Sequence, residues 1–94
     1  YSNLEIVKNI CVILDQLRPQ KKSYKDLITF VQDRPGHDLR YAIDAKKIES
    51  SIGWKARTDF STGITQTIQW YLDNKKWWKP IRDQYSGERL GRKI

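Results

Sequence analysis

The 94-residue sequence predicts a small α+β domain, a three-helix unit with short strands. Three segments place apolar side chains at the three- and four-residue spacing that one face of an amphipathic helix requires. Two brief runs between the first and second of these segments are rich in β-branched and aromatic residues, which favour strands. A chain of this length buries about 60–65 % of the surface that its unfolded form exposes, so we expect one domain, residues 1–94, with a marginal core.

The first helix is predicted over residues 3–17. Asn3 is the expected N-cap, Glu5 suits the positive end of the helix dipole, and Pro19 ends the element. The apolar stripe consists of Val7, Ile10, Cys11, Leu14 and Leu17. Cys11 is the only cysteine of the chain, so it forms no internal disulfide. Because it lies in the apolar stripe, we expect a buried thiol in a reducing compartment.

The two predicted strands cover residues 27–31 and 41–43. The first run, Leu-Ile-Thr-Phe-Val, has apolar groups on both of its faces. Strands of that kind are buried on both sides. A turn at residues 33–38 separates the two runs, so it is expected at the tip of a hairpin or crossover.

Two further helices are predicted downstream. The second covers residues 45–52, with Asp44 as N-cap and Gly53 as the left-handed terminator. The third covers residues 60–74 after the N-cap Asp59, and its buried stripe consists of Phe60, Ile64, Ile68, Tyr71 and Leu72. The residues from 75 onward are interpreted as a tail without a regular element.

The candidate functional side chains lie on either side of a Pro-Gly pair. Pro35 fixes its own φ and Gly36 permits backbone angles that a Cβ would forbid, so the pair predicts a defined bend. Arg34 and His37 flank the bend, and the carboxylates of Asp33 and Asp38 follow on either side. The alternative is an ordinary surface turn decorated with charges.

Other chemistries have weaker signals. The net charge of +7 suggests anionic partners. The Lys and Arg residues are scattered between acids, and no nucleic-acid-binding motif accompanies them, so a free-standing basic nucleic-acid-binding module is retained only as the alternative function. A single histidine lacks the spacing of a metal site, and no Gly-rich phosphate loop or membrane-spanning run is present. Tyr71 and Lys75 have the Tyr-x-x-x-Lys spacing of short-chain dehydrogenases, but Tyr71 belongs to the apolar stripe, so no catalytic role is expected.

The order of motifs resembles the C-terminal region of dTDP-glucose 4,6-dehydratases over essentially the whole chain. The matching stretches are Asp33-Arg34-Pro35-Gly36-His37-Asp38, Arg40-Tyr41-Ala42-Ile43-Asp44-Ala45, Lys47-Ile48, Ile52-Gly53-Trp54-Lys55, Gly63-Ile64 through Thr67, Trp70-Tyr71-Leu72 and Tyr85-Ser86-Gly87-Glu88-Arg89. Ala56 departs from the pattern, since many relatives have proline there. The chain begins at Tyr1 and contains no methionine, so we expect a processed chain or a fragment.

The resemblance implies the C-terminal substrate-binding part of an α/β Rossmann-type extended short-chain dehydrogenase/reductase. The complete enzyme would convert dTDP-glucose to dTDP-4-keto-6-deoxyglucose, by oxidation at C4, loss of water across C5 and C6, and return of the hydride to C6. The family's NAD site and catalytic residues belong to an N-terminal Rossmann domain that this chain lacks. The complete enzyme would be a cytoplasmic homodimer without nucleic-acid or membrane partners.

The same resemblance implies the site residues. The family's nucleotide-sugar contact loop corresponds to Asp33, Arg34, Pro35, Gly36 and His37. A late tyrosine of the family, which touches the nucleotide, corresponds to Tyr85. The chemistry of these side chains agrees, because a guanidinium offers a two-donor fork to a pyrophosphate. An imidazole N–H can donate to a phosphate or ribose oxygen. No catalytic or metal-binding residue is expected in this chain.

Overall fold

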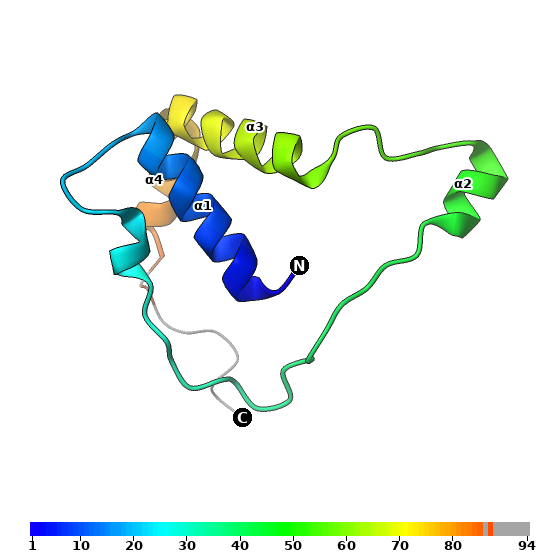
Figure 1. The fold of residues 1–94 in the computed structure, drawn as a ribbon, viewed down its shortest axis with the longest axis horizontal. Helices are drawn as coiled ribbons and strands as arrows, with labels where there is room; N and C mark the ends of the chain where they lie inside the picture. Colours follow the sequence, from blue (N-terminus) through cyan, green and yellow to red (C-terminus); the bar gives the residue numbers. More distant parts are fainter. Residues whose placement is uncertain (86, 88–94) are drawn as a thin grey trace.

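The computed structural model of the chain describes residues 1–85 and 87. Within them the regular elements are all helical: α1 (Asn3–Leu17), the 3₁₀ helix η1 (Tyr24–Leu27), α2 (Lys46–Ile52), α3 (Phe60–Asp73) and α4 (Lys75–Asp83). Helix α1 packs against α3 and η1, and α3 contacts α4. Helix α2 lies apart from the other helices, at the far end of two long connecting segments (Figure 1).

The chain is expanded for its length. Its radius of gyration is 17.0 Å, whereas a compact domain of this size has about 12 Å. Among the described residues only Cys11 and Ile68 are buried apolar residues, with 7 % and 9 % of their surface exposed. The core is therefore confined to the contact between α1 and α3.

Helix α1 covers the predicted residues, but its N-cap is Ser2 and not Asn3. The Ser2 hydroxyl accepts a hydrogen bond from the Glu5 backbone N–H at 3.1 Å, and the Glu5 carboxylate accepts one from the Ser2 backbone N–H at 2.7 Å. This reciprocal capping box satisfies two backbone donors that the helix leaves without a partner. The pattern Ser-x-x-Glu would have identified the cap from the sequence.

The two predicted strands do not form in the described residues. Leu27 ends η1, and Ile28 has extended backbone angles without a partner strand. Residues 41–43 are likewise irregular. β-Branched and aromatic side chains favour an extended backbone, but a strand exists only when a second strand accepts and donates its hydrogen bonds. The short strands of the predicted α+β class are therefore not confirmed, and the regular elements of the described residues are all helical.

Helices α2 and α3 agree closely with the sequence prediction. Helix α2 starts one residue later than predicted, with Ala45 at the N-cap position, although the Asp44 carboxylate accepts from the Lys46 backbone N–H at 3.0 Å. Gly53 ends this helix in the left-handed conformation, with φ of 72°. Asp59 caps α3 as predicted, since its carboxylate accepts from the Thr62 backbone N–H at 2.7 Å.

Helix α4 was not predicted. It follows α3 after Asn74 and contains Pro80 in its interior, a residue that usually breaks helices. The Trp78 indole N–H donates to the Tyr71 carbonyl at 2.7 Å, and the ring centroids of Trp70 and Trp77 lie 5.4 Å apart in an edge-on contact. These contacts with α3 stabilise α4 although Pro80 in its interior disfavours a helix.

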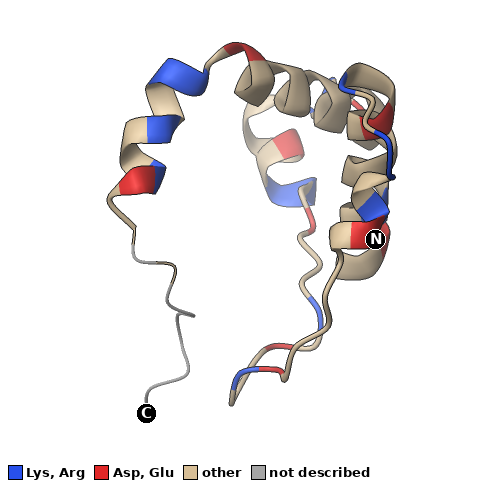
Figure 2. Cartoon of the chain, turned by 90° about the vertical axis from the view of Figure 1, so that its left-hand side faces the viewer, with Lys and Arg blue, Asp and Glu red and all other residues tan. Residues whose placement is uncertain are grey.

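Charged residues are distributed unevenly, since helix α3 carries only Asp73. Basic and acidic bands lie close together on the long loop at the lower end of Figure 2. Within the described residues no three metal-ligating side chains come together. None of the described helices has both the length and the apolar character needed to cross a membrane.

Candidate functional site

The predicted turn is present and its geometry follows from its sequence. The His37 backbone N–H points to the Arg34 carbonyl at 3.4 Å, which closes a four-residue turn with Pro35 and Gly36 in the middle. Gly36 has φ of 68°, so any side chain at this position would be strained. Proline in second position and a positive-φ glycine in third position are typical of a type II turn.

Asp33 organises the side chains around the turn. One carboxylate oxygen, Oδ1, lies 2.6 Å from Nδ1 of His37 and accepts the Arg34 backbone N–H at 2.8 Å. The hydrogen bond from His37, followed by that from the Arg34 backbone, lowers the pKa of the Asp33 carboxyl. Because an ionised carboxylate only accepts hydrogen bonds, Nδ1 of His37 carries the proton. In the neutral imidazole Nε2 is then an acceptor, suited to a ligand hydroxyl group.

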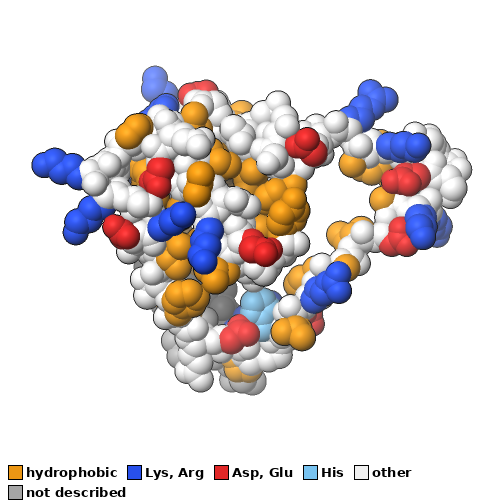
Figure 3. Space-filling model, viewed as in Figure 1, with side chains coloured by type: hydrophobic (Ala, Val, Ile, Leu, Met, Phe, Trp, Pro, Cys, Tyr) orange, Lys and Arg blue, Asp and Glu red, His pale blue; other side chains and the backbone are white. Residues whose placement is uncertain are grey.

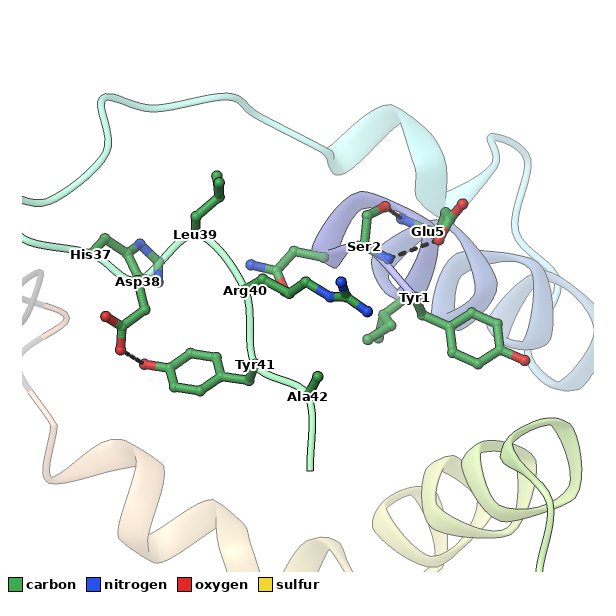
Figure 4. Close-up of a pocket in the computed structure, with 11 residues that line it drawn as sticks. Tyr1, Ser2, Glu5, His37, Asp38, Leu39, Arg40, Tyr41 and Ala42 are labelled. Atoms are coloured by element: carbon green, nitrogen blue, oxygen red, sulfur yellow. Dashed lines mark hydrogen bonds between the residues drawn. The ribbon is translucent and has the colours of Figure 1, made fainter. Parts of the chain in front are cut away.

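Next to this turn lies an open cavity of about 870 Å³. It is bounded by the N-terminal end of α1 and by the segment that follows the turn (Figure 4). The lining residues are Tyr1, Ser2, Asn3, Glu5, Ile6, His37, Asp38, Leu39, Arg40, Tyr41 and Ala42. The Tyr41 hydroxyl donates to the Asp38 carboxylate at 2.6 Å, which holds one wall of the cavity together.

The charges in this cavity are mixed. Arg40 extends from the loop toward the first residues of α1 (Figure 4), and its guanidinium can bind an anion. Glu5 and Asp38 contribute carboxylates to the same walls. The capping box already uses the backbone N–H groups of Ser2 and Glu5, so this helix end does not offer them to a phosphate. Arg40 supplies the one guanidinium of this cavity lining.

The structure brings only some of the predicted site residues together. His37 lines the cavity and Asp33 orients its ring. Arg34 is exposed and does not line the cavity. Tyr85 follows α4, where its backbone N–H donates to the Arg82 carbonyl at 3.0 Å, and it too lies outside the cavity lining. Ser86, Glu88 and Arg89 of the closing motif lie outside the described residues.

Sequence reasoning missed two candidate residues, Arg40 and Tyr41. Both lie within four residues of His37, and both line the cavity. A cation and a phenol that close to a defined turn were the available signal. The sequence does not reveal that α1 forms a wall beside this loop, so it does not identify the two residues as part of a cavity.

Exposed apolar side chains accompany the site. Orange patches appear on the helical body and on the connecting loop, interspersed with basic side chains (Figure 3). Another hollow, of about 450 Å³, is lined by Tyr71, Trp77, Trp78, Ile81 and Arg82 between α3 and α4. It contains none of the predicted site residues.

Comparison with known proteins identifies the family. The family model for GDP-mannose 4,6 dehydratase matches residues 1–67, a range that includes the Asp33–His37 turn and excludes Tyr85. A probable dTDP-glucose 4,6-dehydratase of Sinorhizobium fredii is 60 % identical over 90 residues, which cover 95 % of this chain and 26 % of the relative. The dTDP-glucose 4,6-dehydratases of Neisseria meningitidis and Escherichia coli are 53 % and 54 % identical, over 96 % and 95 % of this chain.

The chain spans about a quarter of the length of these relatives, between 26 % and 27 %. The family match nevertheless extends over well more than half of the chain itself. The chain belongs to the GDP-mannose 4,6 dehydratase family.

Proposed function

We propose that this chain is the nucleotide-sugar-binding portion of a dTDP-glucose 4,6-dehydratase. The observation that carries the proposal is the 60 % identity to a probable dTDP-glucose 4,6-dehydratase over 95 % of the chain. The longer protein would oxidise the sugar of dTDP-glucose at C4, remove water across C5 and C6, and return the hydride to C6. The relatives give no support to a nucleic-acid-binding module.

In this proposal the Asp33–His37 turn contacts the nucleotide-sugar. The exposed Arg34 guanidinium would form a two-donor fork with the pyrophosphate. The His37 ring is already oriented by Asp33, and its Nε2 would accept a hydrogen bond from a sugar hydroxyl. Arg40, which shares the cavity with His37, would supply a second cation for the diphosphate. Tyr85 would contact the nucleotide from the end of α4.

The hydride chemistry of the family calls for NAD, and the residues described here do not fit that cofactor. A dinucleotide pyrophosphate binds at a helix N-terminus whose backbone N–H groups are free. The described residues contain no strand followed by a Gly-rich phosphate loop, and the caps of α1 and α3 already bind the backbone N–H groups of Ser2, Glu5 and Thr62. We propose that NAD is bound by the remainder of the longer protein, which would be a homodimeric cytoplasmic enzyme of Rossmann type.

A full-length chimera tests the proposal. In this chimera, the 94 residues replace the matching quarter of the Sinorhizobium fredii relative. The purified chimera is incubated with NAD and either dTDP-glucose or GDP-mannose, and loss of one water from the sugar nucleotide is followed by mass spectrometry. We expect turnover of dTDP-glucose and not of GDP-mannose. A folded chimera that dehydrates GDP-mannose preferentially, or neither substrate, would contradict the assignment.

Because the remainder of the chimera could hold the substrate alone, a variant must connect the result with this chain. Arg34→Ala removes the proposed pyrophosphate fork. Arg57→Ala removes an exposed arginine outside the turn and is the matched control. We expect only the first variant to raise the KM for dTDP-glucose.

A further inference from the structure

Helix α4 separates its side chains into an apolar and a basic face. Residues four positions apart lie on the same face of a helix. Trp77 and Ile81 form such a pair, and they keep 61 % and 59 % of their surface exposed. Lys75 and Lys79 precede them by two positions each, which places the lysines on the opposite side of the helix. The helix is therefore strongly amphipathic, but its apolar face is not buried.

Little of the described molecule covers α4. Among the described elements it contacts only α3. Figure 2 shows α4 at the upper left, where it projects away from the other helices and carries basic bands. The hollow between α3 and α4 is lined, apart from Arg82, by aromatic and aliphatic side chains. An exposed apolar patch of this kind marks a site of contact with a protein or a membrane.

The basic side chains of α4 distinguish between these two partners. Within the described residues, Arg82 is paired with Asp83, since its Nη2 atom lies 3.2 Å from Oδ1. The three lysines, Lys75, Lys76 and Lys79, are exposed and form no ion pair among these residues. Protein interfaces are depleted of lysine. Two copies that met through this face would also bring their unpaired lysines close together, and like charges repel.

An apolar face with tryptophan beside a lysine-rich face is typical of helices that lie in the surface of a membrane. We infer that α4 binds the surface of a bilayer that contains anionic phospholipids. Trp77 and Ile81 enter the boundary between headgroups and acyl chains, and the lysines contact the lipid phosphates. The remainder of the longer protein and a second copy of this chain are the competing occupants of the apolar face.

A helix in the membrane surface does not span the bilayer, which agrees with the lack of a spanning helix among the described residues. The resemblance to dTDP-glucose 4,6-dehydratases implies no membrane partner, but it does not reveal a helix at residues 75–83 either. Attachment through α4 would hold the longer enzyme at a membrane and leave its chemistry unchanged.

Vesicle flotation tests the inference. The 94-residue chain and the full-length chimera are each mixed with vesicles of phosphatidylglycerol and phosphatidylethanolamine, or of phosphatidylcholine alone, and centrifuged in a sucrose gradient. Bound protein rises with the vesicles, whereas aggregated protein does not. We expect both proteins to float with the anionic vesicles and to be largely released as rising salt screens the charges.

Three results of this experiment would overturn the inference. The first is the absence of flotation in both proteins. The second is flotation of the 94-residue chain but not of the chimera, which would show that the remainder of the longer protein covers the apolar face. The third is equal flotation with phosphatidylcholine, which would show that the lysines do not recognise anionic lipids.

A triple variant of α4 tests the basic face. Each lysine close to an anionic surface strengthens binding about fivefold, so the loss of three should weaken binding roughly a hundredfold. The matched control removes three exposed lysines outside α4 and should retain most of the affinity. Equal losses in the two variants would show that only net charge matters and would refute a site on α4. The variant is Lys75→Gln/Lys76→Gln/Lys79→Gln, and the control is Lys46→Gln/Lys47→Gln/Lys55→Gln.

Ile81→Ser tests the apolar face. Ile81 takes no part in the hydrogen bond from Trp78 to Tyr71, so α4 should remain folded, which circular dichroism checks. We expect binding to the anionic vesicles to weaken roughly tenfold. Ile52→Ser, at a position 73 % exposed on α2, is the control and should bind like wild type. If Ile81→Ser also binds like wild type, the apolar face does not enter the bilayer and the inference fails.

Vesicle binding requires no turnover of dTDP-glucose, so the two proposals can fail separately. A chimera that floats but does not dehydrate dTDP-glucose would retain the membrane helix and refute the function. A chimera that dehydrates dTDP-glucose but does not float would retain the function and refute the membrane helix.

Discussion

The Nδ1 atom of His37 lies 2.6 Å from Oδ1 of Asp33, four residues earlier on the other side of a Pro-Gly bend. The same oxygen accepts the backbone N–H of Arg34. A single carboxylate oxygen thus fixes both the ring of the histidine and the start of the turn. The orientation of His37 therefore depends on the charge of Asp33.

Asp33→Ala should release the His37 ring. Without the carboxylate nothing favours a proton on Nδ1, so the neutral ring should shift toward the tautomer protonated at Nε2, which is usually preferred in water. Nitrogen chemical shifts of the imidazole, measured by NMR near pH 8, report the tautomer. Asp33→Asn keeps a weaker acceptor and should lie between the two. A tautomer that is identical in wild type and Asp33→Ala would show that the contact does not orient the ring.

The same contact predicts a pH dependence. Its hydrogen bonds lower the pKa of Asp33 in the folded chain. A lowered carboxyl pKa means that the contribution to stability is complete above the ordinary value of about 3.9 and is lost as the pH falls through the lowered pKa. Titration of the His37 ring shifts by NMR from pH 5 downward should show the loss in wild type. The transition should be absent from Asp33→Ala.

Arg34→Lys should weaken the binding of dTDP to the chimera nearly as much as Arg34→Ala. Lysine retains the charge but not the planar pair of donors that meets two phosphate oxygens. Loss of a charge-assisted hydrogen bond costs about 1.5–3 kcal/mol, or roughly ten- to more than a hundredfold in affinity. His37→Ala should cost less, because it removes one ordinary hydrogen bond. Calorimetric titration measures the affinity of all three variants. Wild-type affinity in Arg34→Lys would show that the turn has only a structural role.

The isolated chain should neither bind NAD nor dehydrate dTDP-glucose. Its sequence has no Gly-rich phosphate loop between a strand and a helix. Fluorescence titration with NAD and incubation with dTDP-glucose at high protein concentration test the two statements. Turnover by the purified 94-residue chain would place catalytic residues within it.

The core of the isolated chain should be sensitive to one side chain. Ile68 is 9 % exposed, and Ile68→Ala should cost about 2–5 kcal/mol of unfolding free energy. That is comparable with the total stability of a small domain, so the variant should be largely unfolded at 25 °C. Ile52→Ala, at a position 73 % exposed, is the control and should change little. Circular dichroism in urea measures both.

Thermal stability offers a further check. Among the described residues, the small core of Cys11 and Ile68 and the exposed apolar side chains predict a melting temperature below about 65 °C, the upper end of the usual range. They also predict self-association as concentration rises, visible in analytical ultracentrifugation. A cooperative melt above that temperature from a strictly monomeric sample would show that the core is larger than the structure indicates.

The sequence predicted what local chemistry determines. Helices α1 and α3 were placed correctly because their caps and apolar stripes lie within a few neighbouring residues. The turn at Pro35-Gly36 was found for the same reason, since φ of both residues is a local property. The resemblance to dTDP-glucose 4,6-dehydratases was confirmed by the relatives.

The errors concern contacts between distant residues. Strand propensity at residues 27–31 is real, but pairing requires a second strand that the described chain does not supply. Helix α4 was missed because its support, the Trp78 bond to Tyr71, comes from another helix and outweighs the proline within it. The cavity beside His37 was equally out of reach, because α1 forms one of its walls.

The reactivity of the buried Cys11 thiol measures how often helices α1 and α3 separate. The thiol is shielded because it belongs to the small core where α1 packs on α3, and it is the only cysteine of the chain. A thiol reagent therefore reacts only during the moments when the two helices separate. When the reagent is in excess and the reaction is fast, the modification rate equals the rate of opening. A change in that rate on joining the chain to a longer protein would report, from a single sulfur atom, how firmly the rest of the molecule holds the two helices closed.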